Sequence, residues 1–102
     1  MKVRLTEQAQ EDARRIRRWW RKNRTKAPNR FSEELRAAKK RLAVAPHEGQ
    51  VYRRLGGELV QRMLLETSGQ HIYYVVRVSE RLVSVVAIHG AVRGSGPDLT
   101  ER

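Results

Sequence analysis

Cysteine is absent from the chain, which excludes disulfide bonds, thiolate metal sites and a cysteine nucleophile. The histidines His47, His71 and His89 lie far apart, without the spacing of metal ligands. We find no phosphate-binding loop and no GxGxxG sequence. The glycines of Gly56-Gly57 and Gly94-Ser95-Gly96 are instead typical of turns. We therefore expect neither a metal nor a cofactor.

Long hydrophobic runs are also missing. None approaches the roughly 20 residues that a membrane-spanning helix needs, and no apolar segment of a secretory signal follows the N-terminus. We therefore expect a cytoplasmic protein. The length of 102 residues suits one modest core, and 39% hydrophobic residues are typical of a folded protein. We expect a single domain over residues 1–102, in which residues 90–102 form an extended tail.

Acidic residues are scarce and unevenly placed. The chain has 11 Asp and Glu against 22 Lys and Arg, which gives a net charge of +11. Residues 14–30 carry nine Arg or Lys and no acid. Such a concentrated cationic surface is typical of proteins that bind a polyanion or an acidic protein. A charged helix face that only contacts solvent is the alternative.

The first half of the chain predicts two amphipathic helices joined as a hairpin. Thr6 can cap a first helix that ends near Asn23, and a second helix is predicted from Pro28 to just before Pro46. In both, the apolar residues recur at spacings of four, three and four: Ala9, Ala13, Ile16 and Trp20, then Phe31, Leu35, Ala38 and Leu42. Trp19 falls at the margin of the first apolar stripe, and the neighbouring arginines fall on the other faces.

The second half changes to short runs of β-branched and aromatic residues. We predict a short strand at Met1–Leu5 and four later strands, at Gln50–Leu55, Leu59–Glu66, His71–Val78 and Leu82–His89. The glycine-containing and polar linkers between them suit hairpin turns. The order is β-α-α-β-β-β(-β), an α+β fold in which the helical hairpin packs on one face of an antiparallel sheet.

This order of elements, with several anchor residues, resembles the RelE/ParE superfamily of bacterial toxins. The matching residues span nearly the whole chain: Val3-Arg4-Leu5-Thr6 with Ala9 and Asp12, then Phe31, Leu35, Leu42, Pro46 and Gly49, then Arg62, Ile72-Tyr73-Tyr74-Val75-Val76, and the stretch from Val85 to Gly94. The resemblance implies a small toxin that is neutralised by a co-produced antitoxin, whose extended or helical segment wraps it.

The superfamily divides by target, and the residues of this chain favour one branch. RelE-type members cut messenger RNA on the ribosome, whereas ParE-type members block DNA gyrase. All five lysines (Lys2, Lys22, Lys26, Lys39 and Lys40) lie in the first half, and no tyrosine follows His89. RNA cleavage needs a base, a proton donor and charge stabilisation. Arginine serves only the last of these.

We therefore favour a ParE-like gyrase inhibitor that acts by binding and not as an enzyme. The runner-up is a ribosome-dependent mRNA endonuclease, whose site would be Arg62, Arg77, His89 and Arg93. A nucleic-acid-binding module that uses the basic helix, and a decayed copy without toxicity, are further alternatives.

Residues expected to bind a partner come from the basic helix and from the sheet half. They are Arg14, Arg15, Arg18, Trp19, Arg21, Lys22, Arg62 and Arg93. The expected partner is an acidic, ParD-like antitoxin.

Some of these residues have a purely structural alternative. Arg62 could reach solvent from a sheet edge, and Trp19 could fold over the neighbouring helix. His89 is either a general base or a residue that shapes the strand exit. Tyr73 and Tyr74 must point to opposite sheet faces.

Overall fold

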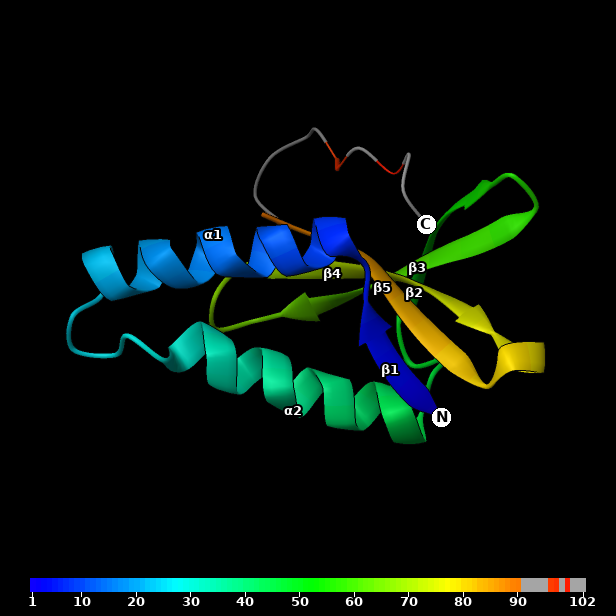
Figure 1. Cartoon of the computed structure of the whole chain (residues 1–102), viewed down its shortest axis with the longest axis horizontal. Helices are drawn as coiled ribbons and strands as arrows, with labels where there is room; N and C mark the ends of the chain where they lie inside the picture. Colours follow the sequence, from blue (N-terminus) through cyan, green and yellow to red (C-terminus); the bar gives the residue numbers. More distant parts are fainter. Residues whose placement is uncertain (91–95, 98, 100–102) are drawn as a thin grey trace.

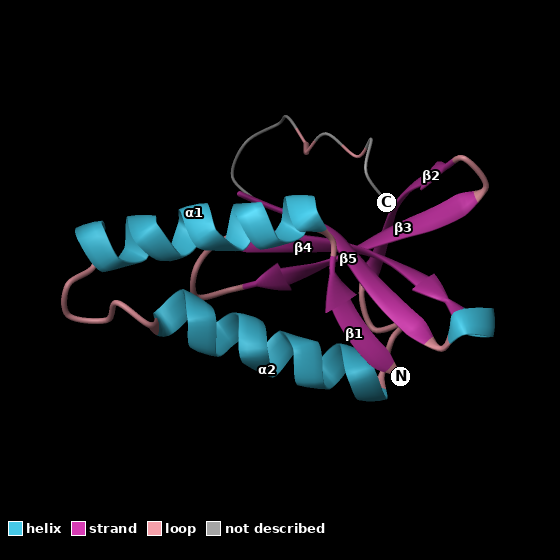
Figure 2. Ribbon diagram, viewed as in Figure 1, coloured by secondary structure: helices cyan, strands magenta, loops and turns pink. Residues whose placement is uncertain are grey.

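The computed structural model describes residues 1–90, 96, 97 and 99. Two helices lie on one side of a five-stranded sheet (Figures 1 and 2). In chain order the elements are β1 (Lys2–Leu5), α1 (Glu7–Asn23), α2 (Arg30–Val44), β2 (Gln50–Leu55), β3 (Glu58–Leu65), β4 (Gln70–Arg77), a 3-10 turn (Val78–Glu80) and β5 (Leu82–Gly90). The α+β class and the helical hairpin on one sheet face are confirmed.

The strands lie in the order β1-β5-β4-β3-β2. The last four form the expected antiparallel meander. The first strand runs parallel to β5, from the pair Lys2–Leu82 to the pair Leu5–Val85. The sheet is therefore mixed and not wholly antiparallel. The helical hairpin supplies the crossover that a parallel arrangement requires, because it separates β1 from the meander in the sequence.

Helix α1 begins and ends where the sequence predicts. The Thr6 hydroxyl accepts a hydrogen bond from the Ala9 backbone N–H at 3.2 Å, so Thr6 is the N-cap. The four apolar residues predicted for its inner face are all buried. Trp20 is 8% exposed and Trp19 is 48% exposed, as their positions on the helix predict.

Helix α2 begins two residues later than predicted. The Arg30 backbone N–H donates to the Ala27 carbonyl at 3.3 Å, which places Pro28 inside a turn before the helix. The fixed φ of proline suits the second position of such a turn. The prediction that Pro28 opens the helix was wrong. The predicted inner face is nevertheless correct, since Phe31, Leu35, Ala38 and Leu42 are all buried.

The sheet has an apolar cluster on each face. On the helix side, Phe31, Leu42 and Tyr74 belong to the larger cluster. On the open side, Val60 and Tyr73 pack with Val75, Val86 and Leu99. Tyr73 and Tyr74 thus lie on opposite faces, and both are buried, which confirms their predicted alternation. The open face carries its own small core as well as the polar residues described below.

The edge of β5 is completed by α1. Beyond the end of β1, the backbone of β5 bonds to the start of the helix: Thr6 N–H donates to the Val85 carbonyl at 3.0 Å. The Ile88 N–H donates to the Asp12 carboxylate at 3.0 Å. Asp12 is 5% exposed and also accepts hydrogen bonds from Gln8 at 3.0 Å and Arg15 at 3.1 Å. A helical carboxylate therefore takes the place of a neighbouring strand.

Replacing Asp12 by alanine is expected to lower the free energy of unfolding by about 1–3 kcal/mol, because the buried Ile88 N–H loses its acceptor. Asp12→Asn keeps an acceptor oxygen and should lose less. Chemical denaturation measures the loss. Glu11→Ala is the matched control, since Glu11 pairs with Arg14 at the surface and should change stability by less than about 1 kcal/mol. Equal stability of the Asp12→Ala and Glu11→Ala variants would contradict this role.

Candidate interaction surfaces

The outer face of α1 is cationic. Arg14, Arg18, Arg21 and Lys22 are exposed and lie on the side of the helix away from the sheet. Arg14 pairs with Glu11 at 2.6 Å, which lowers the pKa of the Glu11 carboxyl through this hydrogen bond and charge. The other three have no carboxylate within ion-pair distance among the described residues.

Two other arginines of α1 also have structural duties. Arg17 donates from Nε to the Ser32 hydroxyl at 3.2 Å and so joins α1 to α2. Arg15 pairs with the buried Asp12 at 3.1 Å, although half of its side chain remains exposed. The basic helix is therefore divided. Arg15 and Arg17 stabilise the packing of α1, whereas Arg18, Arg21 and Lys22 have no described carboxylate partner and are available for a ligand.

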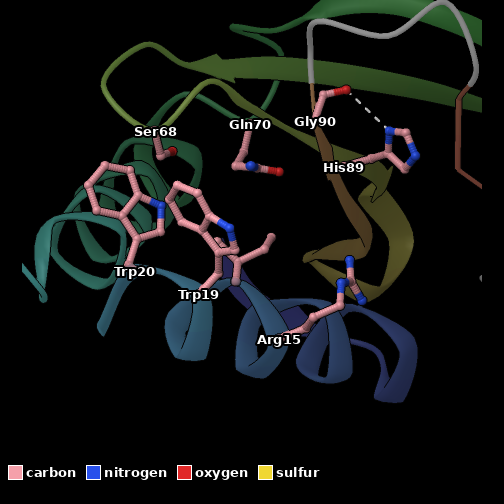
Figure 3. Close-up of a pocket in the computed structure, with 8 residues that line it drawn as sticks. Arg15, Trp19, Trp20, Ser68, Gln70, His89 and Gly90 are labelled. Atoms are coloured by element: carbon pink, nitrogen blue, oxygen red, sulfur yellow. Dashed lines mark hydrogen bonds between the residues drawn. The ribbon is translucent and has the colours of Figure 1, made fainter. Parts of the chain in front are cut away.

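A groove lies between α1 and the ends of β4 and β5 (Figure 3). Its volume is about 400 Å³, and it is lined by Arg15, Ile16, Trp19, Trp20, Ser68, Gln70, His89 and Gly90. The two indole rings meet edge to face, with centroids 5.9 Å apart. The Arg24 guanidinium lies 5.1 Å from the centre of the Trp19 ring. Trp19 is thus held by its neighbours while nearly half of it faces solvent.

One polar atom at this groove has no hydrogen-bond partner among the residues that the structure describes. The Ser68 hydroxyl oxygen is buried, and among the described residues nothing is hydrogen-bonded to it. A buried hydroxyl without a partner is unfavourable. An apolar wall beside such a hydroxyl suits a peptide segment that brings both an apolar side chain and a hydrogen-bonding group. No local pattern in the sequence marks Ser68, since its place depends on the β3–β4 turn approaching α1.

Arg62 lies on the open face of the sheet. Its guanidinium carbon is 5.2 Å from the centre of the Tyr52 ring, and Tyr52 packs edge to face on Tyr73 at 4.8 Å. The Nε atom of Arg62 is buried, and no described atom accepts its hydrogen bond. The aromatic contact holds the cation in place, and the N–H group without an acceptor leaves it able to bind an anion.

Of the residues proposed for a nuclease site, the structure engages Arg77 elsewhere. Arg77 makes two hydrogen bonds to Glu58, at 2.9 and 3.3 Å, and this pairing raises the pKa of Arg77. Glu58 lies four residues before Arg62 along β3. The His89 Nδ1 atom lies 3.2 Å from the Gly90 carbonyl oxygen. Arg93 is outside the described residues.

His71 lies nearer to Arg62 than the sequence alone indicates. It faces His89 in the register of β4 and β5, and its ring packs edge to face on Tyr73 at 5.9 Å. It also lines a pocket of about 340 Å³ together with Arg62. Burial, Arg62 and His89, in that order, lower the pKa of His71 from 6.5, so the ring is neutral at neutral pH. A neutral imidazole beside a cation can accept a proton.

The titration of His71 tests this geometry. Because folding lowers the pKa of His71, this group stabilises the folded state at pH values above its ordinary pKa of 6.5. That stabilisation is lost as the pH falls through the lower pKa of the folded state. Arg62→Ala should raise the pKa of His71 by removing a nearby positive charge. Arg54→Ala, on the edge strand β2, is the control and should leave it unchanged. NMR titration of the ring protons measures both, and identical curves would refute the proximity.

Comparison with known proteins agrees with this architecture. Among the described residues, no helix is long and apolar enough to cross a membrane. No curated protein and no solved structure matches the chain significantly. The family model described as "ParE toxin of type II toxin-antitoxin system, parDE" matches residues 3–91, which takes in both helices and, apart from Lys2 at the start of β1, all five strands. The chain therefore belongs to the ParE toxin family of type II toxin–antitoxin systems.

Proposed function

We propose that this toxin inhibits DNA gyrase and is neutralised by its cognate antitoxin. The family match over residues 3–91 carries the proposal. It is supported by the position of one nuclease candidate, since Arg77 is paired with Glu58, which lies four residues before Arg62 along β3. In this mechanism the released toxin binds gyrase in the cytoplasm, stalls it on DNA and halts replication. It acts by binding, without breaking a bond in its target.

The antitoxin is proposed to dock in the groove beside Trp19. A half-exposed indole in a partly formed pocket is typical of residues that dominate binding energy. Ser68 lines the same groove, and its buried hydroxyl has no hydrogen-bond partner among the described residues. Arg15 lines the groove, and Arg18 lies about one helical turn after Arg15 along α1. Because these side chains are cationic, the docking segment should carry acidic residues. An apolar side chain flanked by carboxylates fits this combination.

A second candidate function is cleavage of messenger RNA on the ribosome. One observation favours it: Arg62 and His71 line one pocket, and His89 faces His71. Arg62 would stabilise negative charge on a phosphate, and a neutral histidine would accept the proton of the 2′-hydroxyl. In this mechanism the open face of the sheet, and not α1, would be the active surface.

The purified toxin should inhibit negative supercoiling of relaxed plasmid by gyrase in a dose-dependent way at micromolar concentration. The double variant Arg62→Ala/His71→Ala should inhibit equally well, because this mechanism needs no proton transfer. Induced cells should form filaments while their messenger RNA remains intact. Unimpaired gyrase, together with messenger-RNA cleavage that the double variant abolishes, would replace the proposal by the second candidate.

Trp19→Ala should weaken antitoxin binding by about 2 kcal/mol, a typical loss for a central interface tryptophan, which is roughly a 30-fold rise in Kd. Isothermal titration with the cognate antitoxin measures this. Val44→Ala is the control, since Val44 is the most exposed large apolar residue in the described part of the chain and ends α2, whereas the groove is formed by α1 and the sheet. An unchanged Kd for Trp19→Ala would exclude the groove as the docking site.

A further inference from the structure

The cations on the outer face of α1 form a continuous ridge. Arg14, Arg18 and the neighbours Arg21 and Lys22 recur at intervals of about one helical turn, and Arg18 points away from the buried stripe of the helix. One turn rises about 5.4 Å, so the ridge presents a positive charge at roughly that interval over about 12 Å. A phosphate backbone also carries its charges at short intervals, about 3.4 Å apart along the axis of each strand of duplex DNA.

The ridge continues into the connection between α1 and α2. Arg24, Lys26 and Arg30 are exposed there. In Figure 1 this connection projects beyond the end of the sheet, on the left of the view. A protruding tip with cations on its surface can approach a rod-shaped polyanion without obstruction from the rest of the molecule. The acids of α1, by contrast, all lie in its first two turns: Glu7, Glu11 and Asp12.

The composition of the ridge favours a nucleic acid over a protein. The centres of protein interfaces are apolar and depleted of charge. The ridge has cations at its centre, and its apolar neighbour Trp19 belongs to the groove at one side. Arg18, Arg21 and Lys22 have no carboxylate partner among the described residues. Phosphodiester backbones bind such cations with release of counterions and need no apolar contact.

We propose that this ridge and the α1–α2 tip bind the phosphate backbone of duplex DNA, without sequence preference. The inference goes beyond inhibition of gyrase, because it gives the toxin a direct contact with DNA whether or not gyrase is its target. This contact would raise the concentration of the toxin along DNA and so favour its encounter with an enzyme that acts on DNA. Trp19 and the groove would remain the antitoxin site on the flank of the same helix.

The number of phosphate contacts predicts how strongly DNA binding depends on salt concentration. Each phosphate that a cation neutralises contributes about −0.9 to the slope of log K against log salt concentration. Four contacts along the ridge alone therefore give a slope near −3.6, and each tip cation that also reaches a phosphate steepens it by about 0.9. Raising the salt concentration from 50 to 200 mM should weaken binding by roughly 100-fold. At low salt, the dissociation constant should be in the micromolar range that is typical of binding without sequence preference.

Fluorescence anisotropy of a labelled duplex of arbitrary sequence, titrated with the full chain over a salt series, tests the proposal without gyrase. The triple variant Arg18→Gln/Arg21→Gln/Lys22→Gln should flatten the slope by about 2.7, for three lost contacts. The matched control Arg36→Gln/Lys39→Gln/Lys40→Gln removes the same charge from exposed positions on α2 and should retain most of the slope. Circular dichroism should show both variants folded, because all six side chains are exposed.

Several outcomes would overturn the inference. Equal weakening by the two triple variants would mean that only net charge matters. A slope near zero, or tighter binding of single-stranded RNA than of duplex DNA, would remove duplex DNA as the ligand. If the ridge variant keeps its DNA affinity and loses antitoxin affinity, the ridge is a protein-binding surface. Because gyrase is absent from the assay, a failure of supercoiling inhibition leaves the result on DNA standing.

Discussion

The placement of every surface in this toxin depends on how the edge of β5 is closed. The first strand covers only the first part of β5, and beyond Val85 the strand would expose unpaired backbone groups. The start of α1 supplies the missing hydrogen bonds. The Thr6 N–H donates to the Val85 carbonyl, and the Asp12 carboxylate accepts from the Ile88 N–H. These bonds fix the rotation of the helix about its axis as well as its position. With Asp12 turned towards β5, the apolar stripe must face the sheet, and the cations must face solvent.

This closure also creates the groove. Because α1 runs past the end of β5, Trp19 comes to lie beside Gly90 and the β3–β4 turn (Figure 3). The same helix therefore has three faces with different duties. The inner face packs on the sheet, the flank at Trp19 is partly apolar, and the outer face is cationic. A single helix can in this way serve the core, a partner segment and a polyanion.

The open face of the sheet is chemically distinct from the helical side. It holds Arg62 on Tyr52, with His71 and His89 on the neighbouring strands. Two features here are more typical of a binding site than of a packed core: the lowered pKa of His71, and an Arg62 Nε that has no hydrogen-bond partner in the described part of the chain. The family match identifies a toxin with a cognate antitoxin. Cleavage of messenger RNA would use the open face of the sheet, whereas the groove and the cations of α1 lie on the helical side. Separate substitutions can therefore test the two sides of the molecule.

The sequence by itself determined the features that depend on local periodicity and capping. The 3.6-residue repeat gave both helix faces, Thr6 gave the start of α1, and the two-residue alternation placed Tyr73 and Tyr74 on opposite sides. Tertiary structure decided what depends on pairing between distant segments. Strand register joined Arg77 to Glu58 and aligned His71 with His89, and the return of the chain after two helices set β1 parallel to β5. Such contacts are selected by the fit of the whole sheet and helix layer, so no short stretch of sequence specifies them.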